Sequence, residues 1–323
     1  MLIHDMKTGD RFEGYYILQN IAQRTTSAGK PFLTLNLADR SGTVTAQVWD
    51  YTGPIGPADV GKVAWLSGLA SEYRGAPQVT VYRLRLATEN DDFKVSDLVA
   101  TAPIEMDETW AWLLELVASM EDKDYRAVCQ KLLAAYGKQF RLIPAAKSMH
   151  HGFVGGLLMH TAYMLKAADF YAGLYPAVDR SLLLAGTLLH DFCKCEEFVT
   201  SPLGLVAEYS LKGQLLGHLV LGAEAAGRAA QELGIPEEKS VLLQHMILSH
   251  HGEPEFGAAV RPMFLEAEIL SSLDTLDAKI YEIEQACRNV QPGEFTPRQW
   301  ALDNRKLYNH DRNHADFKAE LIK

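Results

Sequence analysis

The sequence predicts two domains of different fold class, an N-terminal five-stranded β-barrel followed by an all-α helical bundle. Short runs rich in β-branched and aromatic residues fill the first part of the chain, and apolar residues at helical spacing fill the second. A polar, acidic stretch that contains a proline separates the two patterns. The 323 residues suffice for two domains. We therefore expect a barrel at 1–88, a linker at 89–106, a bundle at 107–295 and a polar C-terminal tail at 296–323.

Five candidate strands define the N-terminal domain. They lie at residues 15–18, 32–37, 44–49, 63–66 and 79–84, and turn residues such as those at 27–29, 39–42 and 74–77 separate them. Several of the strands alternate apolar with polar residues, as strands with one buried face do. Five short strands in about 80 residues are typical of a small barrel, and the OB-fold is the leading candidate.

The charge of the chain restricts how it could bind a nucleic acid. A formal net charge of −10 argues against general adhesion to a polyanion, so any such binding needs a local patch. Residues 9–87 carry eight Lys or Arg against six Asp or Glu. Within them, six side chains could combine cationic and stacking surface for a single strand: Arg24, Lys30, Phe32, Trp49, Tyr73 and Arg74. The alternative is that the aromatic residues belong to the core and the charges are solvated.

Composition points to a soluble cytoplasmic protein. Hydrophobic residues make up 48% and charged residues 22% of the chain. The four cysteines are too few for a disulfide framework in a chain of this length and suit a reducing compartment. No signal peptide is visible, and apolar runs such as 181–189 are too short to span a bilayer, so we expect no membrane association.

The second domain combines helical patterning with buried ionisable residues. Apolar stripes predict helices near 107–119 and 122–136. Further along, histidines and aspartates occur within very apolar helical segments: His160, His190, Asp191, His218, His250, His251 and Asp274. Each histidine alone is more typical of a hydrogen-bonded core residue. Together, on five candidate helices, they are best explained by convergence on one centre.

This residue set predicts a divalent metal site. Burying a His-Asp pair costs free energy unless something binds it, and a metal ion is the usual partner. Imidazole and carboxylate without thiolate favour Mn²⁺, our first choice, or Fe²⁺, Mg²⁺ or Zn²⁺, as one ion or two. Such ions activate water as a nucleophile for phosphorus, and Lys194, Lys147 and His151 could add positive charge around a phosphate. The residues therefore indicate phosphoester hydrolysis.

The spacing of these residues carries a family resemblance. His160, His190-Asp191 and Asp274 resemble the H…HD…D pattern of HD-domain metal-dependent phosphohydrolases. More specifically, several motifs resemble the YhaM family of 3′–5′ exoribonucleases, which carry an OB-fold before the HD domain. These motifs are Pro144-Ala145-Ala146-Lys147, His150-His151, Gly155-Gly156-Leu157-Leu158 with His160-Thr161, Leu248-Ser249-His250-His251-Gly252, and Leu273-Asp274 with Leu276-Asp277-Ala278-Lys279. Residues 32–50, 72–86 and 301–305 also resemble that family, so the likeness covers nearly the whole chain.

The resemblance implies roles for individual residues. The first metal site would comprise His160, His190, Asp191 and Asp274, and the second would comprise His218, His250 and His251 with Asp191 bridging. His190, Asp191 and Lys194 would be catalytic, with Lys194 contacting phosphate. Cys193 departs from the family by replacing a glycine, and is interpreted as a small buried side chain rather than a redox-sensitive one. Asp277 shares a helical face with Asp274, and the resemblance favours Asp274 as the ligand.

The resemblance also implies the substrate, namely single-stranded RNA, with single-stranded DNA as a further possibility. Hydrolysis would proceed from the 3′ end and release nucleoside 5′-monophosphates, in a homo-oligomer. Two alternatives stay open. One is a phosphohydrolase of a small nucleotide whose barrel serves regulation or oligomerisation. The other is a non-catalytic single-strand-binding protein with a structural histidine cluster.

Overall fold

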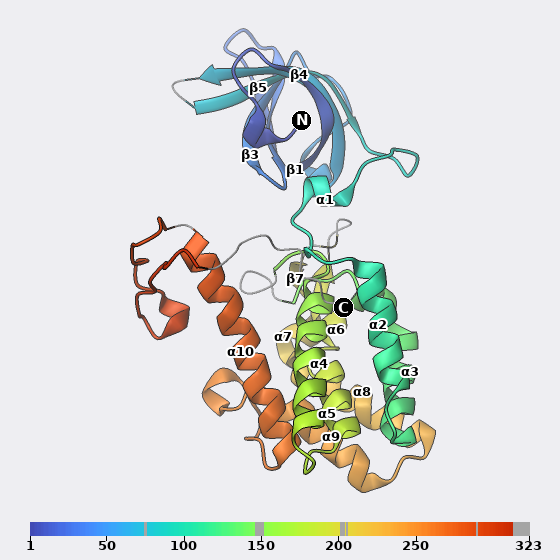
Figure 1. The fold of residues 1–323 in the computed structure, drawn as a ribbon. Coiled ribbons are helices and arrows are strands. Elements are labelled where there is room, and N and C mark those ends of the chain that lie inside the picture. The colour runs from blue at the N-terminus through green and yellow to red at the C-terminus, as the bar shows by residue number, and fades with distance from the viewer. Residues whose placement is uncertain (74–75, 146–151, 201–203, 205, 289, 313–323) are drawn as a thin grey trace. The chain divides into compact units, whose positions relative to one another are not determined.

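The structure, a computed structural model, describes residues 1–73, 76–145, 152–200, 204, 206–288 and 290–312 (Figure 1). The chain forms two compact units, Met1–Thr101 and, among the described residues, those from Ala102 onward. The division lies inside the stretch 89–106 that the sequence marks as a linker. The unit boundary therefore falls some residues later than the predicted end of the barrel.

The first unit is a closed barrel of five strands (blue to cyan in Figure 1). These are β1 (Arg11–Thr25), β2 (Pro31–Asp39), β3 (Gly42–Trp49), β4 (Val63–Tyr73) and β5 (Ala76–Leu86). The order around the barrel is β1-β2-β3-β5-β4, with β1 antiparallel to both β2 and β4 and β3 parallel to β5. This closed Greek-key arrangement confirms the predicted OB-fold.

Strict alternation builds the barrel core. Leu33, Leu35 and Leu37 of β2 are buried, as are Val44, Ala46 and Val48 of β3, while the residues between them face outward. A close approach occurs at the register shift in β4, where a Cβ on Gly68 would lie 2.1 Å from the main-chain oxygen of Thr80. Only glycine fits there without a shift of β5.

Residues after β5 pack onto the barrel. The Asp91 carboxylate accepts hydrogen bonds from the Tyr15 hydroxyl (2.8 Å) and from two Arg85 nitrogens (2.6 and 2.7 Å). The Phe93 ring lies 4.9 Å from that of Tyr15, measured between centroids. A short helix, α1 (Val95–Leu98), follows. The first part of the predicted linker is therefore attached to the barrel rather than free.

The second unit is helical. Its longer helices are α2 (Met106–Ala118), α3 (Lys123–Phe140), α4 (Gly156–Leu174), α5 (Arg180–Leu189), α8 (Gly217–Leu233), α9 (Glu237–Ser249) and α10 (Leu265–Arg288). The short α6 (Lys194–Glu197) and α7 (Leu211–Leu215) flank a hairpin of β6 (Phe198–Thr200) and β7 (Val206–Tyr209). The predicted helices at 107–119 and 122–136 correspond to α2 and α3. The hairpin is an addition to the all-α bundle that the sequence predicted.

The centre of this unit is almost wholly apolar. Helix α4 packs against α2, α5 and α10, and α8 packs against α9. Leu157, Leu158, Leu183, Leu184 and Leu188 have no exposed surface. Because α5 and the first half of α4 are buried on nearly every side, polar groups along these segments are shielded from water and need partners inside the protein.

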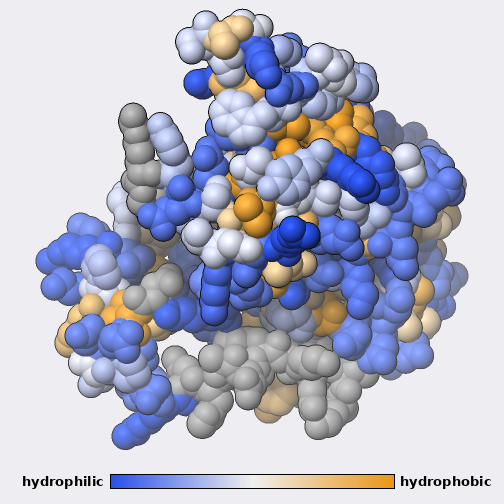
Figure 2. All heavy atoms as spheres, turned by 90° about the horizontal axis from the view of Figure 1, so that it is seen from above, coloured by the Kyte–Doolittle hydropathy of each residue, from blue (hydrophilic) through white to orange (hydrophobic). Residues whose placement is uncertain are grey.

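Figure 2 shows a face dominated by hydrophilic residues, with hydrophobic side chains in smaller areas. Among the described residues, none of the helices has the length and apolar character required to cross a membrane. Near the C-terminus the chain folds back on itself, with bridges between Phe295 and Tyr308 and between Gln299 and Arg305.

Candidate metal centre

The predicted ligands come together inside the helical unit. His160 lies in the second turn of α4, His190 and Asp191 at the end of α5, His218 at the start of α8, and Asp274 in α10. His250 and His251 directly follow α9. His160, His190 and His250 are completely buried, and Asp191 and His218 expose only 3% and 9% of their surface. Five helices therefore contribute polar groups to one apolar interior.

One cluster contains His160, His190 and Asp191, whose candidate ligand atoms lie within 4.8 Å of one another. The Nε2 atoms of His160 and His190 are 3.2 Å apart. Asp274 Oδ1 lies 3.3 Å from His160 Nε2, and Asp191 Oδ2 lies 3.4 Å from His190 Nε2. The structure thus brings all four predicted members of the first set together.

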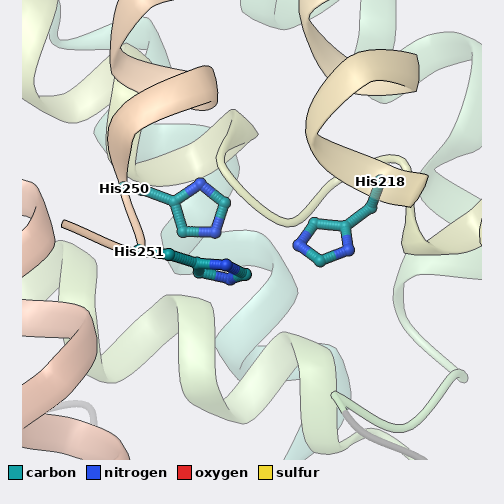
Figure 3. A group of neighbouring side chains, drawn as sticks. All are labelled: His218, His250 and His251. Atoms are coloured by element: carbon teal, nitrogen blue, oxygen red, sulfur yellow. The ribbon is translucent and has the colours of Figure 1, made fainter. Parts of the chain in front are cut away.

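The second cluster contains His218, His250 and His251, again with candidate ligand atoms within 4.8 Å (Figure 3). Figure 3 shows the three rings turned toward a common space, with His218 coming from a different helix than the other two. Asp191 Oδ1 lies 3.2 Å from His218 Nε2 and 3.7 Å from His250 Nε2. The two oxygens of Asp191 therefore face different clusters, Oδ2 the first and Oδ1 the second.

Hydrogen bonds on the outer side of each ring determine which nitrogen faces inward. His190 Nδ1 donates to the Thr187 carbonyl, and His250 Nδ1 donates to the Ile247 carbonyl, both at 2.7 Å. A carbonyl oxygen only accepts, so each Nδ1 carries the proton and each Nε2 presents a lone pair to the centre when the ring is neutral.

The other two rings use carboxylates instead. His160 Nδ1 lies 2.7 Å from Asp277 Oδ2, and His218 Nδ1 lies 2.8 Å from Glu197 Oε2. Asp274 and Asp277, which the sequence could not rank from spacing alone, therefore occupy different places. Asp274 approaches the inward nitrogen of His160, and Asp277 holds the outward one.

The inward atoms are mainly acceptors that face one another. Within the described part of the chain, Asp191 Oδ1, His218 Nε2 and His250 Nε2 are buried without a hydrogen-bond partner. When the His218 ring is neutral, its Nε2 and the Asp191 oxygen face each other with lone pairs at 3.2 Å, which is unfavourable unless a cation lies between them. Ligand atoms this far apart also match neighbouring corners around an ion with bonds of about 2.0–2.2 Å. The residues present therefore fit divalent cations.

The electrostatics of the centre favour positive charge. Burial opposes protonation of His160, but the hydrogen bonds that its ring donates to the Asp274 and Asp277 carboxylates outweigh burial and raise its pKa to about 10. Burial likewise raises the pKa of Asp191, yet Lys194 and His190 lower it well below its usual range. Burial holds the pKa of His250 well below its usual range, so this imidazole stays neutral. Anionic carboxylate oxygens beside imidazole nitrogens, such as those of the neutral His250 ring, are a donor set that suits divalent metals.

Two neighbours of the centre differ in character. Lys194 is buried and its Nζ donates to Asp191 Oδ2 at 2.6 Å, so it lies beside the first cluster. The Cys193 thiol is also buried, and that burial raises its pKa to about 12. A thiol in this state is unreactive, which agrees with interpreting Cys193 as a small packing residue.

The structure describes only some of the residues that the sequence predicts to contact nucleic acid. Phe32 and Trp49 are cross-strand partners with ring centroids 4.9 Å apart, and Arg24 pairs with Phe32 from β1. Lys30 forms an exposed ion pair with Asp50 at 3.3 Å. Tyr73 is exposed at the end of β4. The remaining predicted residues, Arg74, Lys147 and His151, lie outside the described residues.

Comparison with known proteins relates both units to one family. The family model described as "HD domain" matches residues 157–279, which include every predicted metal ligand. Three curated relatives are each named "3′-5′ exoribonuclease YhaM". The relative from Bacillus licheniformis is 39% identical over 95% of this chain and 97% of its own length. The chain belongs to the YhaM family.

Two further relatives extend that match. The relative from Geobacillus sp. WCH70 is 38% identical over 94% of this chain and 93% of its own length. The one from Bacillus subtilis strain 168 is 36% identical over 95% and 97%. The resemblance to the YhaM family drawn from scattered motifs is thus confirmed over nearly the full chain. Among the described residues, Glu197 contacts the second cluster without having been predicted from the sequence, because a glutamate near Lys194 carries no signal by itself.

Proposed function

We propose that this protein is a metal-dependent 3′–5′ exoribonuclease. It would hydrolyse the terminal phosphodiester of single-stranded RNA, and of single-stranded DNA as a secondary substrate, and release nucleoside 5′-monophosphates. The observation that carries the proposal is the position of Asp191. Its two oxygens face two separate sets of buried histidines. A carboxylate in that position suits a two-ion hydrolytic site.

The ligand assignment follows the geometry. His160, His190, Asp191 and Asp274 would hold one ion, and His218, His250 and His251 would hold a second that shares Asp191. Mn²⁺ is our first choice, with Fe²⁺, Mg²⁺ and Zn²⁺ as alternatives. When bound, such ions would lower the pKa of their water towards about 7 and neutralise charge on the phosphate.

The protein's own residues would orient and support this chemistry. The main-chain carbonyls of Thr187 and Ile247 keep His190 and His250 in the tautomer that presents Nε2 inward. Lys194 holds Asp191 through Oδ2 and adds a buried positive charge beside the position of the scissile phosphate. The surrounding leucines exclude water and strengthen each of these interactions.

The barrel would hold the strand whose end is hydrolysed. Phe32 and Trp49 offer stacking surface on the outer face of β2 and β3, where OB-folds bind oligonucleotides, and Arg24 adds a charge. We assign Lys30, Tyr73, Arg74, Lys147 and His151 to substrate contacts on the sequence pattern alone. Binding of the strand by the barrel and hydrolysis at the buried metal site would together explain how a chain of net charge −10 could act on a polyanion.

The proposal includes a cytoplasmic location and a homo-oligomeric state. All four cysteines are buried free thiols, which supports a reducing cytoplasm. Exposed apolar side chains on α10, Leu276 and Ile280, support a homo-oligomer, and light scattering after gel filtration would measure its mass.

The test uses a single-stranded RNA labelled at its 5′ end. With Mn²⁺ we expect a ladder that shortens from the 3′ end, and no ladder with the His190→Ala/Asp191→Ala variant. Intact RNA with Mn²⁺, Fe²⁺, Mg²⁺ and Zn²⁺ alike would refute the exonuclease. Hydrolysis of free nucleotides without hydrolysis of RNA would instead identify a small-nucleotide phosphohydrolase. Tight RNA binding without any hydrolysis would indicate a binding protein.

A further inference from the structure

Four of the five histidine rings in the two clusters are held in two different ways. His190 and His250 each donate to a main-chain carbonyl three residues earlier, in the helix that the histidine directly follows. His160 and His218 instead meet carboxylates from other elements, Asp277 of α10 and Glu197 of α6. Each cluster therefore contains one ring held by the main chain and one held by an acid, and the second cluster also contains His251, whose Nδ1 has no hydrogen-bond partner among the described residues.

The two kinds of acceptor differ in what they do to a ligand. A main-chain carbonyl is neutral, and its position is fixed by the helix. A carboxylate is anionic, so it pulls on the Nδ1 proton and increases the electron density on Nε2, which strengthens that nitrogen as a metal ligand. It also fixes the orientation of the ring from outside its own helix. His160 and His218 are thus the rings whose ligand strength depends on a side chain.

Glu197 is set rigidly in its place. The residue exposes only 7% of its surface, and its carbonyl accepts a hydrogen bond from Ser210 N at 2.8 Å. Helix α7 approaches so closely that a Cβ on Gly213 would lie 2.3 Å from Glu197 O. A buried carboxylate costs free energy unless it is paired, and its partner here is His218. The main chain around Glu197 therefore fixes the position from which its carboxylate oxygen contacts the His218 ring.

We propose that Glu197 and Asp277 are positioning residues that tune the two metal positions separately. Glu197 sets the orientation and ligand strength of His218, and so the affinity of the position shared by His218, His250 and His251. Asp277 does the same for His160 and the first position. This inference rests on the metal site of the proposed function. Neither residue is assigned as a ligand.

The test measures metal affinity rather than activity. Protein stripped with a chelator is titrated with Mn²⁺ by calorimetry, and bound metal is counted after dialysis. The binding step lost in His218→Ala identifies the second position. We expect Glu197→Ala to weaken that step by about 10- to 100-fold and to leave the first unchanged. Asp277→Ala should show the reverse pattern.

Two further variants separate positioning from general effects. Glu196→Gln is the matched control, because it removes the same charge one residue earlier. The Glu196 carboxylate binds Tyr136 and Lys212 and contacts neither metal-ligand cluster. It should leave both affinities unchanged. Glu197→Gln keeps an oxygen that can accept from Nδ1, so it should lose less affinity than Glu197→Ala, and it carries the test should the alanine variant fail to fold.

The outcomes distinguish this inference from the function on which it rests. Unchanged affinity at both positions in Glu197→Ala and Glu197→Gln would overturn the inference, and so would an equal loss at both. Loss at the second position in Glu196→Gln as well would overturn it too, because charge alone would then explain the effect. A wild-type protein that binds no divalent ion would overturn the proposed function itself.

Discussion

Added salt is expected to weaken the binding of single-stranded RNA only modestly. Outward positions on β2, on β3 and on residues 20–25 of β1, which pair with β2, alternate with inward-facing residues and are almost all uncharged. They include Asn20, Ala22 and Arg24 on β1, Phe32, Thr34 and Asn36 on β2, and Thr45, Gln47 and Trp49 on β3. Arg24 is the one charged residue among these nine, and nearby Lys30 is paired with Asp50. Such a face would hold bases by stacking and hydrogen bonds rather than phosphates by charge.

The magnitude follows from counterion release. For single strands, log K falls with log[salt] by about 0.7 per phosphate neutralised. One or two contacts predict a loss of about 3- to 7-fold in affinity between 50 and 200 mM salt. A groove that neutralises five phosphates would lose more than about 100-fold over the same range.

The assay is fluorescence anisotropy of a labelled single-stranded RNA with the full chain in chelator, so that no hydrolysis occurs. Trp49→Ala should weaken binding by about 5- to 150-fold, the equivalent of 1–3 kcal/mol for one stacked base, without changing the salt slope. Arg24→Ala should reduce the slope by about 0.7. A wild-type loss of 100-fold or more would refute the argument, because it would show that phosphates dominate the contact.

Three further predictions concern stability and reactivity. Gly68→Ala should lower the free energy of unfolding by about 1–3 kcal/mol, measured by denaturant, because a Cβ there would collide with the main-chain oxygen of Thr80; unchanged stability would contradict that geometry. Asp122 caps α3 and accepts a hydrogen bond from Lys239, which lowers the pKa of the Asp122 carboxyl from its usual value of 3.8. The carboxylate therefore stabilises the fold at pH values above 3.8, and this stabilisation is lost as the pH falls through the lowered pKa. Asp122→Ala should therefore cost about 1–2 kcal/mol at pH 7 and progressively less below pH 4, and a cost independent of pH would count against the pairing. All four thiols are buried, so a thiol reagent at neutral pH should react with none of them until the protein is unfolded, and rapid reaction of Cys193 would disprove its packing role.

The barrel strands were predictable because the pattern that identifies each strand lies within a few consecutive residues. Leu33, Leu35 and Leu37 alternate with polar residues, and that alternation alone identifies the inner face of β2. The hairpin β6–β7 was not predictable in the same way. Its strands are three and four residues long, and they lie between two one-turn helices where no periodicity can develop.

The clustered histidines and aspartates were predictable as a set, but their individual contacts were not. His160, His190 and His250 stand out because polar rings in apolar helices need a shared explanation. Asp274 and Asp277 are three residues apart on one helix face, so only the position of the His160 ring separates them. The role of Glu197 depends on how α6 and α8 meet in space, and sequence spacing contains no such information.

The most direct test of the central claim counts bound Mn²⁺ in three proteins by equilibrium dialysis and elemental analysis. We expect two ions per chain in the wild type, one in His218→Ala and none in Asp191→Asn, because the two oxygens of Asp191 face the two positions. A full complement of ions in Asp191→Asn, or none in the wild type, would contradict it.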